Sequence, residues 1–302
     1  MQGDAVIIEV ALNEAVTPAT HAHVPQSPAE CATDARRCAE AGAAIAHWHA
    51  VDASGTQRLA DADLYGQALD TMAGCVLGYP SYPIDVPDTV EARLSHCLRL
   101  RNEHGMELGP LDVATVNLVF IDTARSLLAP LEPTADHDVI RNSLPFVAAA
   151  LTRYREVGLV PTVAAFDVGS TRTVAALAQV GILSQPFLLK IFLWGSPLIG
   201  PEPSVEALDL HLRQIPDNVD IEWIVVPYGI TEPPCIEELA RAALDRGGGV
   251  RIGIGDNPTA LAHLDNPRAV ELAPRWATEA RRPVASATGL RQRLGIDRPH
   301  QP

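Results

Sequence analysis

Short apolar runs alternate along the chain with segments of helical period. The runs are rich in Val, Ile and Leu and are bounded by polar, Gly or Pro residues, which is typical of buried strands. Such runs predict eight strands at residues 5–12, 43–50, 74–77, 111–118, 160–166, 187–194, 221–226 and 250–254.

Helix signals fill several of the intervals between these strands. Ser27 is placed as an N-cap, Pro28 as the first helical residue and Glu30 as the second half of a capping box, and Gly42 follows the helix end. Cap-like residues predict further helices at 88–105, 134–158, 170–181 and 204–213.

The repeated strand-then-helix unit favours an α/β fold of the (β/α)8 barrel type. A doubly wound sheet would most naturally carry a Gly-rich phosphate turn after its first strand, whereas this chain has the long, proline-broken "LNEAVTPATHAHVPQSP". We therefore predict one barrel domain over residues 1–302, with about 268–302 forming a helical closure.

Composition narrows the function classes. The chain has 302 residues, is 47% hydrophobic and carries a formal charge of −14 with no basic cluster longer than a pair, which disfavours nucleic-acid binding. It has no basic leader or long apolar stretch, so we expect a soluble cytoplasmic protein without a membrane partner. The five cysteines lack a C-x-x-C pair, so neither a disulfide framework nor a thiolate zinc site is indicated.

The stretch "AGAAIAHWHAVD" holds the most informative pair of residues. His47 and His49 end the second predicted strand, and alternation along a strand places both imidazoles on one face. At the carboxyl end of a barrel strand, where barrel enzymes carry their chemistry, such a pair can chelate a divalent metal. The structural alternative is that one or both are core histidines with satisfied hydrogen bonds.

Other polar residues fall at the same predicted rim. Glu14 follows strand one and could bind metal, hold a cationic substrate group or remain solvated. Ser81 lies in the turn "GYPSYP", where it could donate to a substrate carboxylate or serve the turn alone. Thr115 and Asn117 share one face of predicted strand four, which makes them candidate substrate-binding residues.

Strand eight carries a basic residue inside an apolar run. Arg251 needs an anionic partner there, and Asp256 is the nearest carboxylate in sequence. The two could form a catalytic pair in which Asp256 is a general base, or a purely structural ion pair. Pairing with an arginine is expected to lower the pKa of the carboxyl group.

Four segments together resemble the β-keto acid cleavage enzyme family: "ALNEAVTP", "SPAECATDARRCAEAGAAIAHWHAVD", "FDVGSTRT" and "GGGVRIGIGDNP". The resemblance covers nearly the whole chain, and the second segment is the most specific. It implies a single (β/α)8 barrel that binds Zn²⁺ or another divalent cation and assembles as a homotetramer. It also implies an enzyme that transfers CoA from acetyl-CoA to a β-keto acid and releases acetoacetate.

The resemblance further implies roles for individual residues. His47 and His49 would be metal ligands, and Arg251 with Asp256 would deprotonate the keto acid. Glu14 would touch the distal end of the substrate, which would favour an amine or quaternary ammonium there. Ser81 and Thr115 would lie near the substrate carboxylate, although "GYPSYP" departs from the family's Thr/Gly-rich turn.

One departure concerns the metal itself. Where the family commonly has "GLEDN", with the glutamate as a third ligand, this chain has "GIGDN", and Gly255 cannot coordinate a metal. Water, substrate oxygens or another carboxylate, with Glu9 and Glu14 as candidates, must complete the site.

Two rival interpretations remain at this stage. An amidohydrolase-type metal-dependent barrel also uses an H-x-H strand, but there the pair normally lies on strand one and is backed by further histidines. A non-catalytic barrel that binds a metal or metabolite is the second rival, because the family glutamate is missing.

Overall fold

A parallel barrel of eight strands forms the centre of the computed structural model, which describes residues 5–83, 86–117 and 139–296. The order of the strands around the sheet is β3-β2-β1-β10-β9-β8-β7-β4, and β3 and β4 lie next to each other where the sheet closes. This is the predicted TIM-barrel fold. The barrel strands are β1 Ile8–Ala11, β2 Ile45–His47, β3 Leu77–Tyr79, β4 Leu108–Asp112, β7 Val160–Ala165, β8 Phe187–Trp194, β9 Ile221–Tyr228 and β10 Gly249–Ile252.

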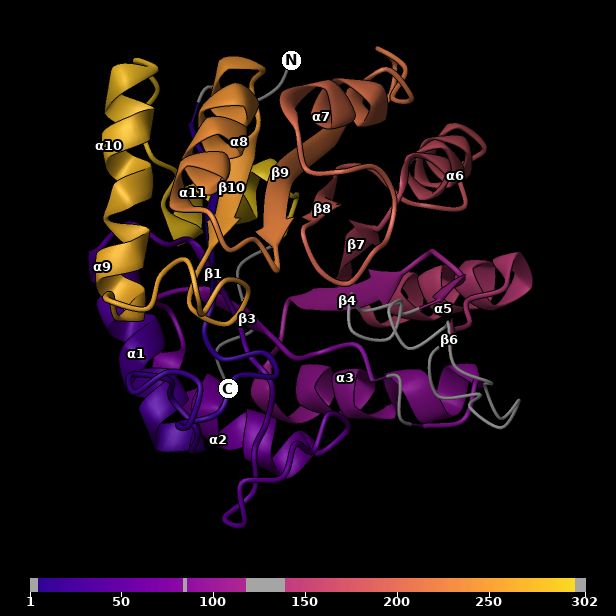
Figure 1. Ribbon diagram of the computed structural model, residues 1–302. Coiled ribbons are helices and arrows are strands. Elements are labelled where there is room, and N and C mark those ends of the chain that lie inside the picture. Colours follow the sequence, from indigo (N-terminus) through magenta and orange to yellow (C-terminus); the bar gives the residue numbers. More distant parts are fainter. Residues whose placement is uncertain (1–4, 84–85, 118–138, 297–302) are drawn as a thin grey trace, which may run out of the picture.

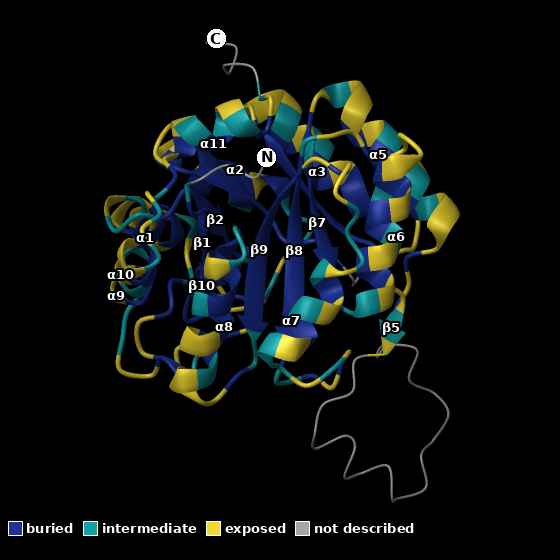
Figure 2. Ribbon diagram, turned by 90° about the horizontal axis from the view of Figure 1, so that it is seen from above, coloured by how far each residue is buried: buried dark blue, intermediate teal, exposed yellow. Residues whose placement is uncertain are grey.

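Helices surround the barrel (Figure 1), with their outward faces exposed and the strands buried (Figure 2). The first helix begins as predicted, because Ser27 accepts from the Glu30 backbone N–H while the Glu30 side chain accepts from Ser27. None of the described helices has both the length and the apolar character needed to cross a membrane. The helices are α1 Pro28–Glu40, α2 Ala62–Met72, α3 Val90–His104, α5 Leu144–Val157, α6 Val168–Gln179, α7 Val205–Leu212, α8 Pro233–Asp245, α9 Asn266–Val270, α10 Leu272–Glu279 and α11 Ala287–Arg293.

The predicted fourth strand was misplaced. The barrel strand is β4, which begins three residues earlier than the predicted 111–118 and contains Gly109 and Pro110. These residue types suggested a turn, but a side chain at Gly109 would meet the Tyr154 ring at 2.8 Å, so helix packing requires a glycine there. Val116–Asn117 instead forms β5, which pairs antiparallel with β6, Val139–Ile140, outside the barrel.

Smaller errors concern element ends. The third strand lies at Leu77–Tyr79 rather than 74–77, and the predicted helix over 134–158 begins at Leu144 in the described residues. The predicted helix at 170–181 begins earlier, because Asp167 is its N-cap and Ser170 the reciprocal partner in the capping box. The predicted helices did not include α2 and α8.

The two ends of the barrel differ in how they are closed. Helix α11 covers the amino ends of the strands, where Leu290 is fully buried. Arg291 pairs with Glu107 at 2.8 Å, and Arg293 pairs with Glu222, so the helix is also held electrostatically. A site can therefore open only at the opposite end of the barrel, where the carboxyl ends of the strands lie.

Candidate active site

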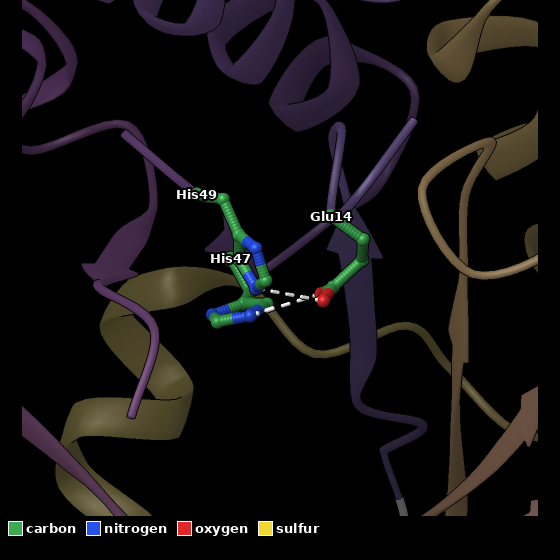
Figure 3. A group of neighbouring side chains, drawn as sticks. All are labelled: Glu14, His47 and His49. Carbon is green, nitrogen blue, oxygen red and sulfur yellow. Dashed lines mark ion pairs between the residues drawn. The ribbon is translucent and has the colours of Figure 1, made fainter. Parts of the chain in front are cut away.

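His47, His49 and Glu14 converge at the carboxyl ends of β1 and β2 (Figure 3). The Nε2 atom of His47 lies 2.9 Å from one carboxylate oxygen of Glu14, and the Nε2 atom of His49 lies 2.8 Å from the other. The backbone of Glu14 has φ 44°, a left-handed conformation that is unfavourable for a residue with a side chain. That turn brings the carboxylate of Glu14 to the two imidazoles.

Neighbouring groups fix both rings. His47 Nδ1 lies 3.3 Å from the carbonyl oxygen of Tyr79, and His49 Nδ1 lies 3.2 Å from the Gln57 side-chain oxygen. The orientation of the Gln57 amide is set because its nitrogen donates to the Glu14 carbonyl. The Asn13 side chain accepts from the His49 backbone N–H and donates to the His49 carbonyl, which joins the loop after β1 to the end of β2.

This hydrogen bonding determines which nitrogens are free. Both Nδ1 atoms face oxygen acceptors and so must donate, which leaves each Nε2 of the neutral rings with a lone pair pointing at Glu14. A carboxylate oxygen is also an acceptor, so two acceptors face each other at hydrogen-bond distance in both contacts. A proton or a cation between them resolves the conflict.

The two contacts differ in how this conflict can be resolved. Burial lowers the pKa of His47 to about 3, so this ring is neutral at physiological pH. Burial also lowers the pKa of His49, but the Glu14 charge and the hydrogen bonds to Glu14 and Gln57 together outweigh that effect, and the pKa is raised overall. A proton can therefore bridge the His49 contact, whereas a cation would resolve the contact of the neutral His47 ring. The charges of His49 and Arg251 overcome burial and hold the pKa of Glu14 well below its usual range. Two imidazoles and a carboxylate with fixed outer partners are a donor set that fits a divalent metal.

Glu14, and not a residue at position 255, supplies the carboxylate of this group. A Cβ atom at Gly255 would lie 3.0 Å from Glu14 Cγ, so the Glu14 side chain lies directly in front of Gly255. Glu9 and Glu14 were the two candidates for the third ligand, and Glu14 is the one that lies with His47 and His49. Glu9 instead accepts from Tyr79 and from Arg251.

Arg251 is the centre of a buried cluster of charges. Its guanidinium is 2% exposed and donates to Glu9 at 3.3 Å, to Glu14, and to both carboxylate oxygens of Asp256 at 2.8 and 2.6 Å. The expected contact with Asp256 is therefore present. Pairing with Arg251 lowers the pKa of Asp256 as expected, but burial has the larger effect and raises that pKa to about 7 overall.

A cavity of about 210 Å³ opens beside these groups. Five predicted site residues line it, whereas Asp256, which accepts hydrogen bonds from Arg251, is not part of the lining. A larger hollow of about 700 Å³ lies near the amino end of β9, where barrel enzymes do not carry their chemistry. The smaller cavity is lined by Glu14, His47, His49, Ser81, Tyr82, Pro110, Asp112, Ile140, Phe166, Lys190, Phe192, Trp194, Pro197, Tyr228 and Arg251.

Two predicted substrate-binding residues are placed elsewhere. Thr115 is exposed, and its hydroxyl accepts from the Asn142 backbone N–H. Asn117 is exposed in β5. Neither lines the cavity as the described residues define it, because both follow the true fourth barrel strand instead of forming it.

The sequence prediction missed two charged residues of the cavity. Burial raises the pKa of Asp112, the last residue of β4, to about 6. Burial lowers the pKa of Lys190, which lies in the middle of β8. The misplaced fourth strand hid Asp112, whereas Lys190 could have been found because a lysine inside "FLLKIFLW" is out of place in a buried strand.

Comparisons with known proteins agree with this architecture. A family model described as beta-keto acid cleavage enzyme matches residues 5–296. The 3-dehydrocarnitine:acetyl-CoA trimethylamine transferase of Rhizobium meliloti (strain 1021) is 24% identical over 262 residues, which cover 80% of this chain and 79% of the relative.

Solved structures of ObcA share the fold. The complex with a C4-CoA adduct and oxalate has a TM-score of 0.65 at 17% identity, and the match covers 90% of this chain and 67% of that chain. The complex with oxaloacetate has a TM-score of 0.64 with the same identity and coverage. At this identity the likeness supports the barrel fold and nothing finer.

Proposed function

The chain belongs to the beta-keto acid cleavage enzyme family, and we propose that it transfers CoA from acetyl-CoA to a β-keto acid, releasing acetoacetate and a new acyl-CoA. The observation that carries the proposal is the pair of imidazole nitrogens that face the Glu14 carboxylate in the cavity. That group lies beside the Arg251 and Asp256 ion pair, as a reaction that begins with proton removal requires.

We assign the metal site to His47, His49 and Glu14. A divalent cation bound there, with Zn²⁺ as the first candidate, would supply Lewis-acid polarisation of the keto group and so make the neighbouring carbon more acidic. The buried charges support this assignment. Glu9, Glu14, Asp112 and Asp256 are four buried carboxyl groups, and a divalent cation would offset negative charge among them.

Deprotonation requires a carboxylate whose pKa is close to neutral. Asp256, with a pKa raised to about 7, is assigned as the general base, and Arg251 is the residue that positions it. Asp112 is the comparison residue, because it lines the cavity and has a pKa raised to about 6. Exchange of the α-hydrogens of the keto acid in D₂O should be lost in Asp256→Asn. Loss of this exchange in Asp112→Asn but not in Asp256→Asn would identify Asp112 as the general base instead.

The later steps follow from the carbanion. It attacks the thioester carbonyl carbon of acetyl-CoA, CoA moves within the adduct to the former keto carbon, and cleavage of the carbon–carbon bond frees acetoacetate. Ser81 lines the cavity and is assigned to the substrate carboxylate. The role implied for Glu14 at the distal end of the substrate is revised, because its carboxylate is engaged by both histidines and Arg251. Tetrameric assembly and a cytoplasmic location stay predictions.

Turnover tests the proposal directly. Protein loaded with Zn²⁺ or Mn²⁺ should convert acetyl-CoA and at least one acid of a β-keto acid panel to acetoacetate and the matching acyl-CoA. His47→Ala should lose both activity and bound metal, whereas His263→Ala, which changes an exposed histidine, should retain both. Stable metal binding without turnover of any panel member would favour the non-catalytic barrel.

A further inference from the structure

The chain contains a single lysine. Of its 23 lysine and arginine residues, all but Lys190 are arginines. Lys190 is 4% exposed inside the barrel. Lysine is among the residues least often buried, and it differs from arginine in its compact ammonium group. In a chain that uses arginine everywhere else, a buried lysine points to a position where arginine cannot take its place.

The position of Lys190 is central to the candidate active site. It lies in the middle of β8, between the register partners Ala164 of β7 and Ile224 of β9. Leu188 and Phe192, two residues away on either side, belong to the cluster of apolar side chains inside the barrel, so alternation directs Lys190 inward as well. Its side chain lines the same cavity as the imidazole pair.

Lys190 has few partners for a buried charge. Its Nζ atom donates to the Tyr79 hydroxyl at 3.1 Å and lies 4.7 Å from the centre of the Tyr79 ring. The Tyr79 hydroxyl in turn donates to Glu9. Within the described part of the chain, no carboxylate oxygen lies within 4.0 Å of Nζ, although an ammonium group has three protons to donate.

Arg251 does not offer the same capacity. Glu9, Glu14 and Asp256 accept hydrogen bonds from its guanidinium, so its donors are already directed to protein carboxylates. Among the residues that line the cavity, Lys190 is thus the cation whose N–H protons are still available to a ligand. A buried ammonium without a carboxylate partner is unfavourable until an anion reaches it.

We propose that Lys190, which lines the cavity together with Ser81, binds the carboxylate group of the keto acid. This inference rests on the proposed function and names the recognition residue of the same site. The compact ammonium fits over the Tyr79 ring, where a planar guanidinium would need more room.

Equilibrium binding tests the proposal independently of turnover. Malonate, an unreactive dicarboxylate, is titrated by calorimetry into metal-free and Zn²⁺-loaded protein. Lys190→Met should weaken binding by about 10- to 100-fold in both states, because a charge-assisted hydrogen bond is lost. Arg153→Met is the matched control, because it removes an exposed cation that pairs with Glu156 on α5, and should leave binding unchanged.

Each outcome of the titration is informative. Equal malonate affinity in wild type and Lys190→Met, or absence of malonate binding by the wild type, would overturn the proposal. Thermal unfolding verifies that the variant is folded, and Lys190→Gln serves as a second variant if it is not. Malonate binding that depends on Lys190 in a protein without turnover would sustain this inference while the proposed function fails.

Kinetics and covalent trapping separate recognition from covalent catalysis. In Lys190→Met the KM for the keto acid should rise by about 10- to 100-fold, with the KM for acetyl-CoA changed less than threefold. Incubation with keto acid and cyanoborohydride should leave the protein mass unchanged. A reduced adduct on the peptide containing Lys190 would instead identify the amine as a nucleophile that forms an imine with loss of water, and would overturn the proposal.

Discussion

Replacement of Gln57 by alanine should weaken metal binding without removing a ligand. Gln57 has no contact with the proposed cation, but its oxygen accepts from His49 Nδ1 at 3.2 Å and its amide nitrogen donates to the Glu14 carbonyl. Loss of such an outer partner typically reduces metal affinity by about 10- to 100-fold, or roughly 1.4 to 2.7 kcal/mol. Gln57 holds both a ligand ring and the loop of a second ligand, so we expect the upper part of this range.

Competition with a chromophoric chelator measures the effect. Wild type, Gln57→Ala and Gln67→Ala are titrated with Zn²⁺ at one pH, and Gln67 serves as control because its side chain is exposed on α2. Gln57→Ala should show the weaker affinity, whereas Gln67→Ala should match the wild type. A Zn²⁺ affinity for Gln57→Ala within twofold of the wild type would refute the argument that the outer hydrogen bonds orient the imidazoles.

Three further predictions concern stability. Ser27→Ala removes the N-cap of α1 and should lower the unfolding free energy in urea by about 1 kcal/mol, and no change would show that the capping box is dispensable. Burial raises the pKa of Asp112 to about 6, so this carboxyl contributes stability that is present below about pH 4 and is lost as the pH rises through 6. Asp112→Asn should therefore flatten the fall in unfolding free energy between pH 4 and 7, and an unchanged slope would contradict the raised pKa. Gly253→Ala would place a Cβ atom 2.1 Å from the Ala11 carbonyl oxygen, so thermal unfolding should show a loss of about 3 kcal/mol, and a wild-type midpoint would contradict the close approach.

The accuracy of the strand predictions follows from local chemistry. The prediction for 187–194 matched β8 at both ends, because its eight apolar and basic residues contain no Gly or Pro. The fourth strand failed because Gly109 and Pro110 carry the usual signals of a turn. Their true role depends on Tyr154, whose ring packs against Gly109 and whose hydroxyl donates to the Pro110 carbonyl. Such a contact between residues 44 positions apart leaves no local trace in the sequence.

The candidate site was predictable where one strand supplied it. His47 and His49 share a face because strand residues alternate, and the structure places both rings together at the cavity. Glu14 was left among several roles because its contact with the rings depends on a left-handed turn that residue types alone do not specify. The raised pKa of Asp256 was missed for a different reason. Its arginine partner is visible in the sequence, but the extent of its burial is not.

Gly255 and Glu14 are close neighbours in the candidate site. A Cβ atom at 255 would lie 3.0 Å from Glu14 Cγ, so a side chain there would require Glu14 to shift by a few tenths of an ångström. Glu14 also accepts from Arg251, which binds Asp256. The carboxylate proposed to hold the metal is therefore one hydrogen bond away from the arginine that positions the proposed base. A cation at Glu14 would compete with Arg251 for that carboxylate and strengthen the hold of Arg251 on Asp256. Metal binding at Glu14 would thereby change the basicity of Asp256 through Arg251.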